Sequence, residues 1–288
     1  MSDHTLVPAS TARPPRRAPV SEPPCEAGRR VSEEVYWRDY YGQSDICYEW
    51  NNGVLEVKPV SNQETFLIYA WLLSLLRTFL ASRPIADLTG LDMGFRLPLP
   101  AGTVIRRPDM AVVHHDNVQP LRLEDNSYRG VYDLCIEALS DRKQADIDRD
   151  AKQKKGEYAT GGVPEYYILH ADPGLRAFYR RDAASGLYRP LPEVDGVIAS
   201  AVLPGFRFRV ADLLRRPGDA ALIGDPVYAD FAFPGWQRER ARAEAEAKRA
   251  DAEAKRAGAE ARQAEVERQR AEALAARLRA LGVDPDQD

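Results

Sequence analysis

The sequence predicts a mixed α/β domain that is followed by a long C-terminal α-helix. A strongly apolar helical stretch opens the central region, and short β-branched and apolar runs follow it, with a second helical stretch between two of them. The final region is dominated by Ala, Glu, Arg and Lys and contains almost no turn residues. Because strands interrupted by helices are typical of layered α/β proteins, we expect a mixed β-sheet flanked by helices.

Composition divides the 288 residues into three regions. Residues 1–30 are rich in Pro, Ser, Ala and Arg without an apolar period, so we expect them to be a disordered leader. Residues 31–235 hold the predicted α/β domain, and residues 236–288 hold the long helix. The domain carries 23 basic and 29 acidic side chains, which argues against a large sequence-independent grip on nucleic-acid phosphates. Any nucleic acid must then be held by a local patch, by metal ions or by a partner.

The cysteine pattern and the N-terminal sequence indicate the cellular compartment. Cys25, Cys47 and Cys135 show neither a C-x-x-C pattern nor a histidine at metal-ligand spacing, so neither a disulfide framework nor a zinc site is expected. No signal-peptide-like apolar segment follows Met1, and no apolar run reaches the length of a membrane span. We therefore expect a cytoplasmic protein without a membrane partner.

An Asn-Gly turn and an apolar helix are predicted at the start of the domain. Residues 47–57 alternate around Asn52-Gly53, and this dipeptide tolerates the positive φ angles that a type I′ hairpin turn requires. Ser61 and Glu64 have the spacing of an S-x-x-E capping box, which predicts the start of the apolar helix. We expect this helix to stop before Pro84.

Further runs predict strands on both sides of a second helix. The two apolar runs that predict interior strands are Ile105–Val113 and Tyr132–Ser140. A helix is expected over roughly residues 144–160, with Gly161-Gly162 as its C-terminal stop. The remaining extended pieces are Gly94–Pro100, Gly162–His170, and two segments beyond it that predict a meander, LRAFYR and GLYRPL.

The C-terminal region contains a heptad-like repeat. Steps of four and three from Ala243 meet Ala at each position as far as Ala264, and after Arg268 they meet Ala271, Ala275 and Leu278. This pattern favours a long helix that forms a coiled coil, giving a homodimer. Because alanines bury little apolar area, a single solvated helix held by Glu–Lys and Glu–Arg pairs is an equal alternative.

Two carboxylates lie within predicted apolar strands. Asp109 lies in the run IRRPDMAVV and Glu137 in the run YDLCIEALS. A carboxylate in such a run is costly unless it is paired or bound to a metal, although a strand-end carboxylate that meets solvent is the simpler alternative for either residue alone. On adjacent strands the two could converge on one Mg²⁺, which prefers oxygen ligands.

A lysine shares the apolar face of the second helix. On a helix over residues 144–160, four residues at helical spacing fall on one face: Ile147, Ala151, Lys154 and Tyr158. Lys152 and Lys155 project elsewhere and are interpreted as surface charges. Asp150, one turn before Lys154, is placed to pair with it. The alternative for Lys154 is a side chain whose stem covers apolar surface while its ammonium reaches water.

Together, in this order and spacing, the motifs resemble the bacterial "putative restriction endonuclease" family of the PD-(D/E)XK nuclease superfamily. The resemblance covers about residues 32–215, extends loosely to the tail, and implies a restriction-endonuclease-like fold. The residues that carry it are Tyr48-Glu49, Asn52-Gly53, Pro108-Asp109, Glu137-Ala138-Leu139-Ser140, Asp150, Lys154, Tyr158, Gly162-Val163-Pro164-Glu165-Tyr166-Tyr167 and the end of the tail from Leu278 to Asp286.

The resemblance also implies roles for individual residues. Asp109 and Glu137 would bind Mg²⁺ or Mn²⁺, and Lys154 would be the catalytic lysine of an endonuclease that cuts DNA. The superfamily's usual lysine position holds Leu139 here, and in this family the lysine lies on the following helix. Glu49, Asp150 and Tyr158 would be accessory residues. This chain departs from the family at Gln63-Glu64, where a histidine is common.

Two other function classes compete with the metal-dependent endonuclease. The first is a catalytically weak or inactive nuclease-fold scaffold or DNA-binding module that assembles through its helical tail. The acidic domain favours it, whereas the intact set of Asp109, Glu137 and Lys154 opposes it. The second is a glycosidase with Asp109 and Glu137 as acid and base, which leaves Lys154 without a role.

Overall fold

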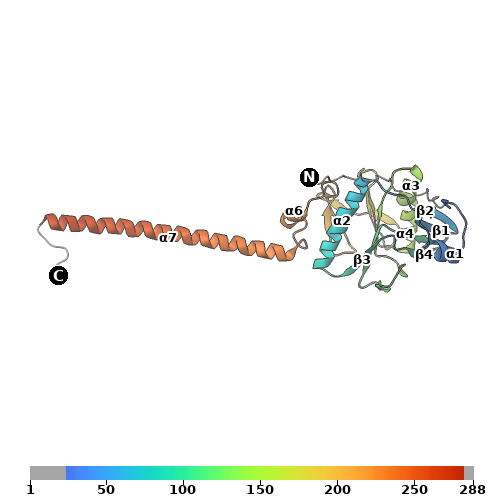
Figure 1. The fold of residues 1–288 in the computed structure, drawn as a ribbon, viewed down its shortest axis with the longest axis horizontal. Coiled ribbons are helices and arrows are strands. Elements are labelled where there is room, and N and C mark those ends of the chain that lie inside the picture. Colours follow the sequence, from blue (N-terminus) through green and yellow to red (C-terminus); the bar gives the residue numbers. More distant parts are fainter. Residues whose placement is uncertain (1–23, 282–288) are drawn as a thin grey trace, which may run out of the picture. The chain divides into compact units, whose positions relative to one another are not determined.

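The computed structural model describes residues 24–281, which form two compact units. The first unit contains residues 24–59 and Arg96–Arg106, and the second contains Val60–Phe95 and residues 107–281. Residues 1–23 of the predicted leader lie outside the described residues, whereas residues 24–30 are described. In that short segment the Gly28 amide donates to the Leu55 carbonyl at 2.8 Å. Figure 1 labels the main helices and strands.

The first unit is built on a four-stranded sheet with the strand order β2-β1-β5-β4. The predicted hairpin is confirmed: Asn52 and Gly53 have φ angles of 45° and 94°, and Tyr48 pairs with Val57. Buried aromatic and aliphatic side chains form its core, with Tyr36 and Ile105 completely inaccessible. Its elements are α1 (Glu33–Val35), η1 (Tyr36–Tyr40), β1 (Tyr48–Asn51), β2 (Val54–Val57), β4 (Phe95–Leu99) and β5 (Gly102–Arg106).

The second unit contains a mixed six-stranded sheet with the order β10-β9-β8-β7-β6-β3, in which only β7 and β8 pair in parallel. Its strands are β3 (Ala86–Gly90), β6 (Met110–His114), β7 (Leu134–Ala138), β8 (Glu165–Leu169), β9 (Ala177–Arg181) and β10 (Tyr188–Pro190). A three-stranded sheet contains β11 (Glu193–Val194), β12 (Val197–Ala199) and β13 (Arg207–Arg209), followed by α5 (Asp212–Arg215) and α6 (Asp219–Gly224). The predicted interior strand 132–140 and the meander after residue 170 are confirmed.

Helix α2 (Gln63–Ser82) is the main core helix of the second unit, and it ends before Pro84 as predicted. The predicted cap is wrong by one residue, because the Asn62 side chain accepts from the Thr65 amide at 2.9 Å. The Ser61 hydroxyl donates instead to the Ala138 carbonyl on β7. By length and composition α2 alone among the described helices could cross a membrane, but it packs on β3, β7 and β8. Its buried residues are Thr65, Ile68, Trp71, Leu72, Leu75, Leu76 and Phe79.

The predicted strand 105–113 is divided in two. Strand β5 ends at Arg106 in the four-stranded sheet, and β6 begins at Met110 in the six-stranded sheet. Pro108 explains the break, because proline has no N–H for a ladder hydrogen bond and restricts the residue before it. Asp109 therefore does not lie within a strand as predicted but immediately before β6.

The predicted helix 144–160 is present but contains a π-helical turn. It consists of α3 (Gln144–Asp148), the π-helix η2 (Arg149–Lys154) and α4 (Lys155–Gly161), and Gly162 ends it with a φ of 91° as predicted. The π turn changes the predicted buried face, since Asp150, Lys154 and Tyr158 are buried whereas Ile147 and Ala151 are half-buried.

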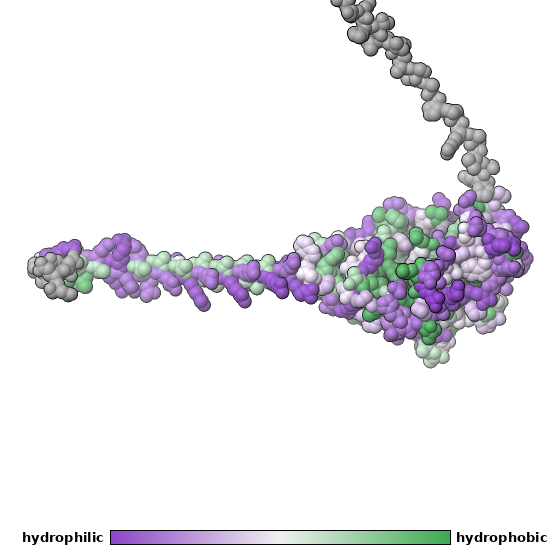
Figure 2. Space-filling view, turned by 60° about the horizontal axis from the view of Figure 1, so that its bottom comes forward, coloured by the Kyte–Doolittle hydropathy of each residue, from purple (hydrophilic) through white to green (hydrophobic). Residues whose placement is uncertain are grey.

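Helix α7 (Pro234–Ala280) confirms the predicted long C-terminal helix. A helix of 47 residues is about 70 Å long. None of its residues is buried, and hydrophilic side chains project along it in Figure 2. Its surface is therefore available along its whole described length.

We expect that Glu165→Gln lowers the free energy of unfolding by about 2 kcal/mol, the size of a lost charge-assisted hydrogen bond. The buried Glu165 carboxylate accepts from the Tyr167 and Ser200 hydroxyls and from the amides of Ala201 and Val202, which ties β8 to the turn between β12 and β13. Urea unfolding measures the change. Glu193→Gln, at an exposed position on β11, is the matched control and should have little effect.

Candidate active site

The pairing of β6 with β7 brings Asp109 and Glu137 together. Met110, the first residue of β6, pairs with Ile136, so Asp109 and Glu137 are the residues that directly adjoin this pair in the chain. Asp109 Oδ2 also accepts from the Ala138 amide at 2.6 Å, which fixes this carboxylate beside the end of β7. Asp109 is half-buried and Glu137 is 1% exposed.

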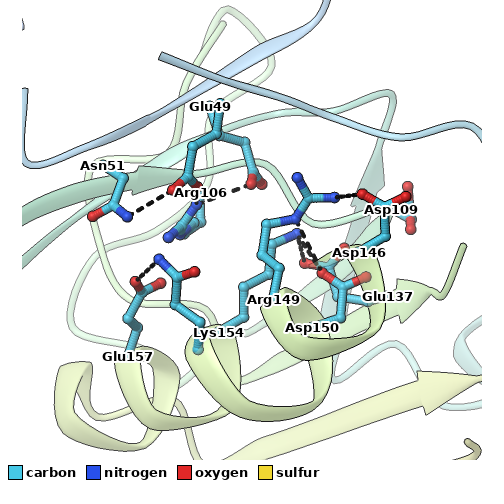
Figure 3. Close-up of polar contacts among 12 residues, drawn as sticks. Glu49, Asn51, Arg106, Asp109, Glu137, Asp146, Arg149, Asp150, Lys154 and Glu157 are labelled. Atoms are coloured by element: carbon cyan, nitrogen blue, oxygen red, sulfur yellow. Dashed lines mark hydrogen bonds and ion pairs between the residues drawn. The ribbon is translucent and has the colours of Figure 1, made fainter. Parts of the chain in front are cut away.

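Lys154 lies against Glu137 and Asp150 rather than in solvent. Its Nζ is 3.0 Å from Glu137 Oε1 and 3.2 Å from Asp150 Oδ1, and the residue is 1% exposed. The Tyr158 hydroxyl donates to the same Glu137 oxygen at 2.8 Å. Figure 3 shows Lys154 extending from η2 toward Glu137 and Asp150. Four of the predicted residues therefore form one buried cluster: Glu137, Asp150, Lys154 and Tyr158. Asp109 lies beside this cluster, because it accepts from the amide of Ala138, the residue after Glu137.

Buried groups beneath the cluster respond to its charges. Burial raises the pKa of the Cys135 thiol well above its usual value, the Glu137 charge raises it further, and the Lys154 charge acts in the opposite direction. Burial also raises the pKa of Tyr166, with Asp150 and Glu137 adding to the effect. The Tyr166 hydroxyl donates to the Asp150 carbonyl at 3.0 Å, so this neutral phenol supports the backbone of η2.

Two further charged residues in the cluster, Arg149 and Asp146, were not predicted from the sequence. The Arg149 side chain is only 11% exposed, and its Nη2 lies 3.5 Å from Asp146 Oδ1. Its Nε lies 3.8 Å from the Asp150 oxygen that Lys154 contacts. On a straight α-helix Arg149 and Lys154 would be about 140° apart. The dense run of alternating charges from Asp146 to Lys155 was the available signal, but no Gly or Pro marks the π turn.

Residues 35–211 match the Uma2 family, which is described as "Putative restriction endonuclease". The chain belongs to the Uma2 family. This finding confirms the resemblance that the motifs predicted. No protein with a curated description matches the chain. Among solved structures, the chain is similar to a "putative nuclease belonging to DUF820" from Anabaena variabilis ATCC 29413. The two are 17% identical, the similarity covers 60% of this chain and 92% of that one, and the TM-score is 0.47.

The charges of this Uma2-family site fit a divalent cation. Four carboxylates (Asp109, Glu137, Asp146 and Asp150) and two cations (Arg149 and Lys154) give these six residues a formal charge of −2. Mg²⁺ is commonly held by one or two carboxylates together with water and substrate phosphate. Within residues 24–281 no group of three or more His, Cys, Asp or Glu residues could hold a metal. Asp109 and Glu137 offer the carboxylate oxygens that Mg²⁺ takes as ligands, and metal binding by these two residues stays a prediction.

Glu49, one of the three predicted accessory residues, lies in the first unit and has a buried cationic partner. Arg106 is fully buried, and its Nη1 lies 3.1 Å from Glu49 Oε2 and also contacts Glu56. Burial acts to raise the pKa of Glu56, but Arg106 and a hydrogen bond from Asn51 hold that pKa below its usual value. Glu49 therefore helps to neutralise Arg106, and its accessory role in metal binding stays a prediction.

We expect Lys154→Gln to lower the free energy of unfolding by about 3 kcal/mol in metal-free solution, because it leaves buried carboxylates without their ammonium partner. Urea unfolding measures this loss. A second measurement is the rate at which a thiol reagent labels Cys135, which is buried in the intact site. This rate should rise in Lys154→Gln, because the site opens more often.

Lys152→Gln removes the same charge two residues away. Lys152 pairs with Asp148 at the exposed surface, so this variant should leave both stability and Cys135 labelling near those of the unaltered chain. Equal effects of the two substitutions would contradict the burial argument for Lys154.

Proposed function

We propose that this chain is a Mg²⁺- or Mn²⁺-dependent endonuclease that hydrolyses DNA phosphodiester bonds. Its family membership supports a nuclease in general. The observation that carries the finer proposal is the buried Lys154 ammonium, which lies 3.0 Å from Glu137 Oε1, while Asp109 accepts from the amide of Ala138, the residue after Glu137. Two carboxylates and one ammonium near the end of strand β7 suit the hydrolysis of a charged phosphodiester.

Asp109 and Glu137 would hold the metal. The Ala138 amide, which donates to Asp109 Oδ2, orients the first carboxylate, and the Tyr158 hydroxyl orients the second. When bound, Mg²⁺ would supply Lewis-acid chemistry: it would lower the pKa of bound water and neutralise phosphate charge. Tyr158 is in this proposal a positioning residue, because it acts through Glu137.

Lys154 would stabilise the negative charge that develops on the phosphate. A fixed cation in a water-poor site acts strongly on such charge, because no solvent has to reorganise during the reaction. Asp150 contacts the same ammonium at 3.2 Å and limits where it can lie. Asp150 is therefore also a positioning residue.

A specific observation favours the alternative, a nuclease-fold scaffold that does not cut. Glu137 Oε1 already receives both the Tyr158 hydroxyl and the Lys154 ammonium. Those contacts can stabilise a buried carboxylate without a metal. The two functions differ in whether a divalent cation binds and whether DNA is cut.

Metal binding distinguishes the endonuclease from the scaffold directly. Calorimetric titration with Mn²⁺ should give a binding isotherm for the unaltered chain, and Asp109→Asn should weaken binding at least about tenfold through loss of a charged ligand. Asp87→Asn, at a half-exposed position on β3, is the control and should leave the isotherm unchanged. An isotherm that Asp109→Asn does not alter would exclude Asp109 as a ligand.

Cleavage tests the role of Lys154. With Mn²⁺ and a chelator control, single-turnover cleavage of DNA should fall about a hundredfold or more in Lys154→Gln, while the Mn²⁺ isotherm remains. Rates are normalised to the folded fraction, because this variant also loses stability. Lys152→Gln should cut at nearly the original rate. A chain that neither binds Mn²⁺ nor cuts DNA would support the scaffold.

We also propose that two copies associate through α7, but only when its acidic flanks are neutralised or screened. With the alanine stripe as the seam, acidic residues flank it on both sides, so that like charges would face each other in a parallel dimer. These residues are Glu246, Glu253, Glu260 and Glu267 on one flank and Glu244, Asp251, Glu265 and Glu272 on the other.

Sedimentation tests this proposal. At neutral pH and low salt we expect a monomer, and near pH 4 or in about 1 M salt a dimer, because protonation or screening removes the repulsion. A hydrogen bond from Arg268 lowers the pKa of Glu265, so repulsion at Glu265 persists to lower pH than at an ordinary glutamate. Glu260→Lys with Glu267→Lys should permit dimers at low salt. A monomer under every condition would favour a single solvated helix.

A further inference from the structure

Arg149 is a nearly buried arginine that the proposed chemistry does not use. It is the first residue of η2, and its side chain is 11% exposed. Removing a guanidinium from water is costly and is offset only by good pairing. Its position beside Lys154 within the carboxylate cluster therefore calls for an explanation beyond packing.

The contacts of Arg149 with the two carboxylates are long. The separations are 3.5 Å to Asp146 and 3.8 Å to Asp150, both beyond an ordinary charge-assisted hydrogen bond. By contrast, Arg209 in the same unit binds Asp225 with both terminal nitrogens, at 2.8 Å and 3.1 Å. Moreover, the Asp150 oxygen that faces Arg149 is closer to Lys154, at 3.2 Å. These two contacts of Arg149 therefore lack the fork-to-fork geometry that guanidinium and carboxylate prefer.

The π turn puts Arg149 and Lys154 on one side of the helix. In a π-helix residues five apart lie one turn above each other, whereas in an α-helix they would be widely separated. Figure 3 shows both side chains rising from η2, and both contact the same Asp150 oxygen. The guanidinium of Arg149 and the ammonium of Lys154 therefore lie close together, which suits a ligand that carries several negative oxygens.

We propose that Arg149 binds a backbone phosphate of the DNA strand that is cut, at a position next to the cleaved bond. The planar guanidinium would exchange its long contacts with Asp146 and Asp150 for two parallel hydrogen bonds to non-bridging phosphate oxygens. Asp150 would remain paired with Lys154. This inference rests on the proposed nuclease function. It adds a substrate-binding residue that gives the acidic domain a local grip on DNA.

The test combines Arg149→Ala with DNA in which one phosphate at a time is replaced by an uncharged methylphosphonate. Binding is measured by fluorescence anisotropy with Ca²⁺ in place of Mg²⁺, so the readout does not require cleavage. For the unaltered chain, one methylphosphonate position should weaken binding about tenfold to a hundredfold, the size of one charge-assisted contact. Arg149→Ala should weaken binding to ordinary DNA by a similar factor. When Arg149→Ala is combined with the methylphosphonate at that position, DNA binding should be no weaker than with either change alone.

Controls separate contact from structure. Arg142→Ala removes an exposed arginine shortly before α3 and should still show the full methylphosphonate effect at that position. Arg149→Lys keeps the charge without the fork and should recover part of the affinity. If Arg149→Ala fails to fold, Arg149→Lys takes its place in the binding measurements. The proposal would be overturned if, at every phosphate position, Arg149→Ala and the methylphosphonate each weakened binding independently of the other.

The outcome is distinguishable from that of the nuclease proposal. A chain that binds DNA through Arg149 but never cuts it with Mn²⁺ would refute cleavage and retain the phosphate contact. A chain that cuts DNA while Arg149→Ala binds every DNA form normally would refute the role of Arg149 alone. The slope of log affinity against log salt gives a second measure, and it should fall by about one in Arg149→Ala.

Discussion

The pairing of Lys154 with Glu137 and Asp150 is the interaction on which the rest of the site depends. A single charge in this interior would cost several kcal/mol, so each of the three needs the others. Strand β7 provides Glu137, whereas η2 provides Asp150 and Lys154. Their pairing therefore fixes the helix against the sheet. The contacts that hold this helix against the sheet of the second unit are the same contacts that set the charges of the candidate site.

This arrangement also reconciles an acidic domain with a polyanionic substrate. Residues 31–235 have 23 basic against 29 acidic side chains, so attraction between the whole domain and DNA is weak. In the proposed function, recognition would depend on a few cations in fixed positions and on a bound divalent ion. Long-range steering would contribute little to the rate of encounter, and discrimination would come mainly from contacts formed at the site.

Local rules allowed much of the fold to be predicted from the sequence. The turn at Asn52-Gly53 and the helix end at Gly162 were predictable because positive φ angles limit the residues that fit there. The strand break at Pro108 was missed, because the apolar run continues on both sides of it and only the sheet topology separates them. The helix cap shifted to Asn62 because a tertiary contact with Ala138 uses the Ser61 hydroxyl.

The site could be predicted in part for the same reason. Asp109, Glu137 and Lys154 are visible as charges within apolar patterns, and the geometry places them in one region. Arg149 was not visible, because its position depends on a π turn that no residue type marks. A projection onto a uniform α-helix misplaces the residues before such a turn relative to those after it.

The discontinuous makeup of the first unit has a consequence for dividing this protein into pieces. Its four-stranded sheet draws β1 and β2 from the N-terminal segment and β5 from Arg96–Arg106, which is inserted between two parts of the second unit. A shortened chain that began at Val60 would keep β5 but lose its neighbour β1. The backbone of Val104 and Ile105, both buried in the intact chain, would then border an open sheet edge. Such an edge recruits other chains, so N-terminal trimming would favour aggregation over an isolated, soluble second unit.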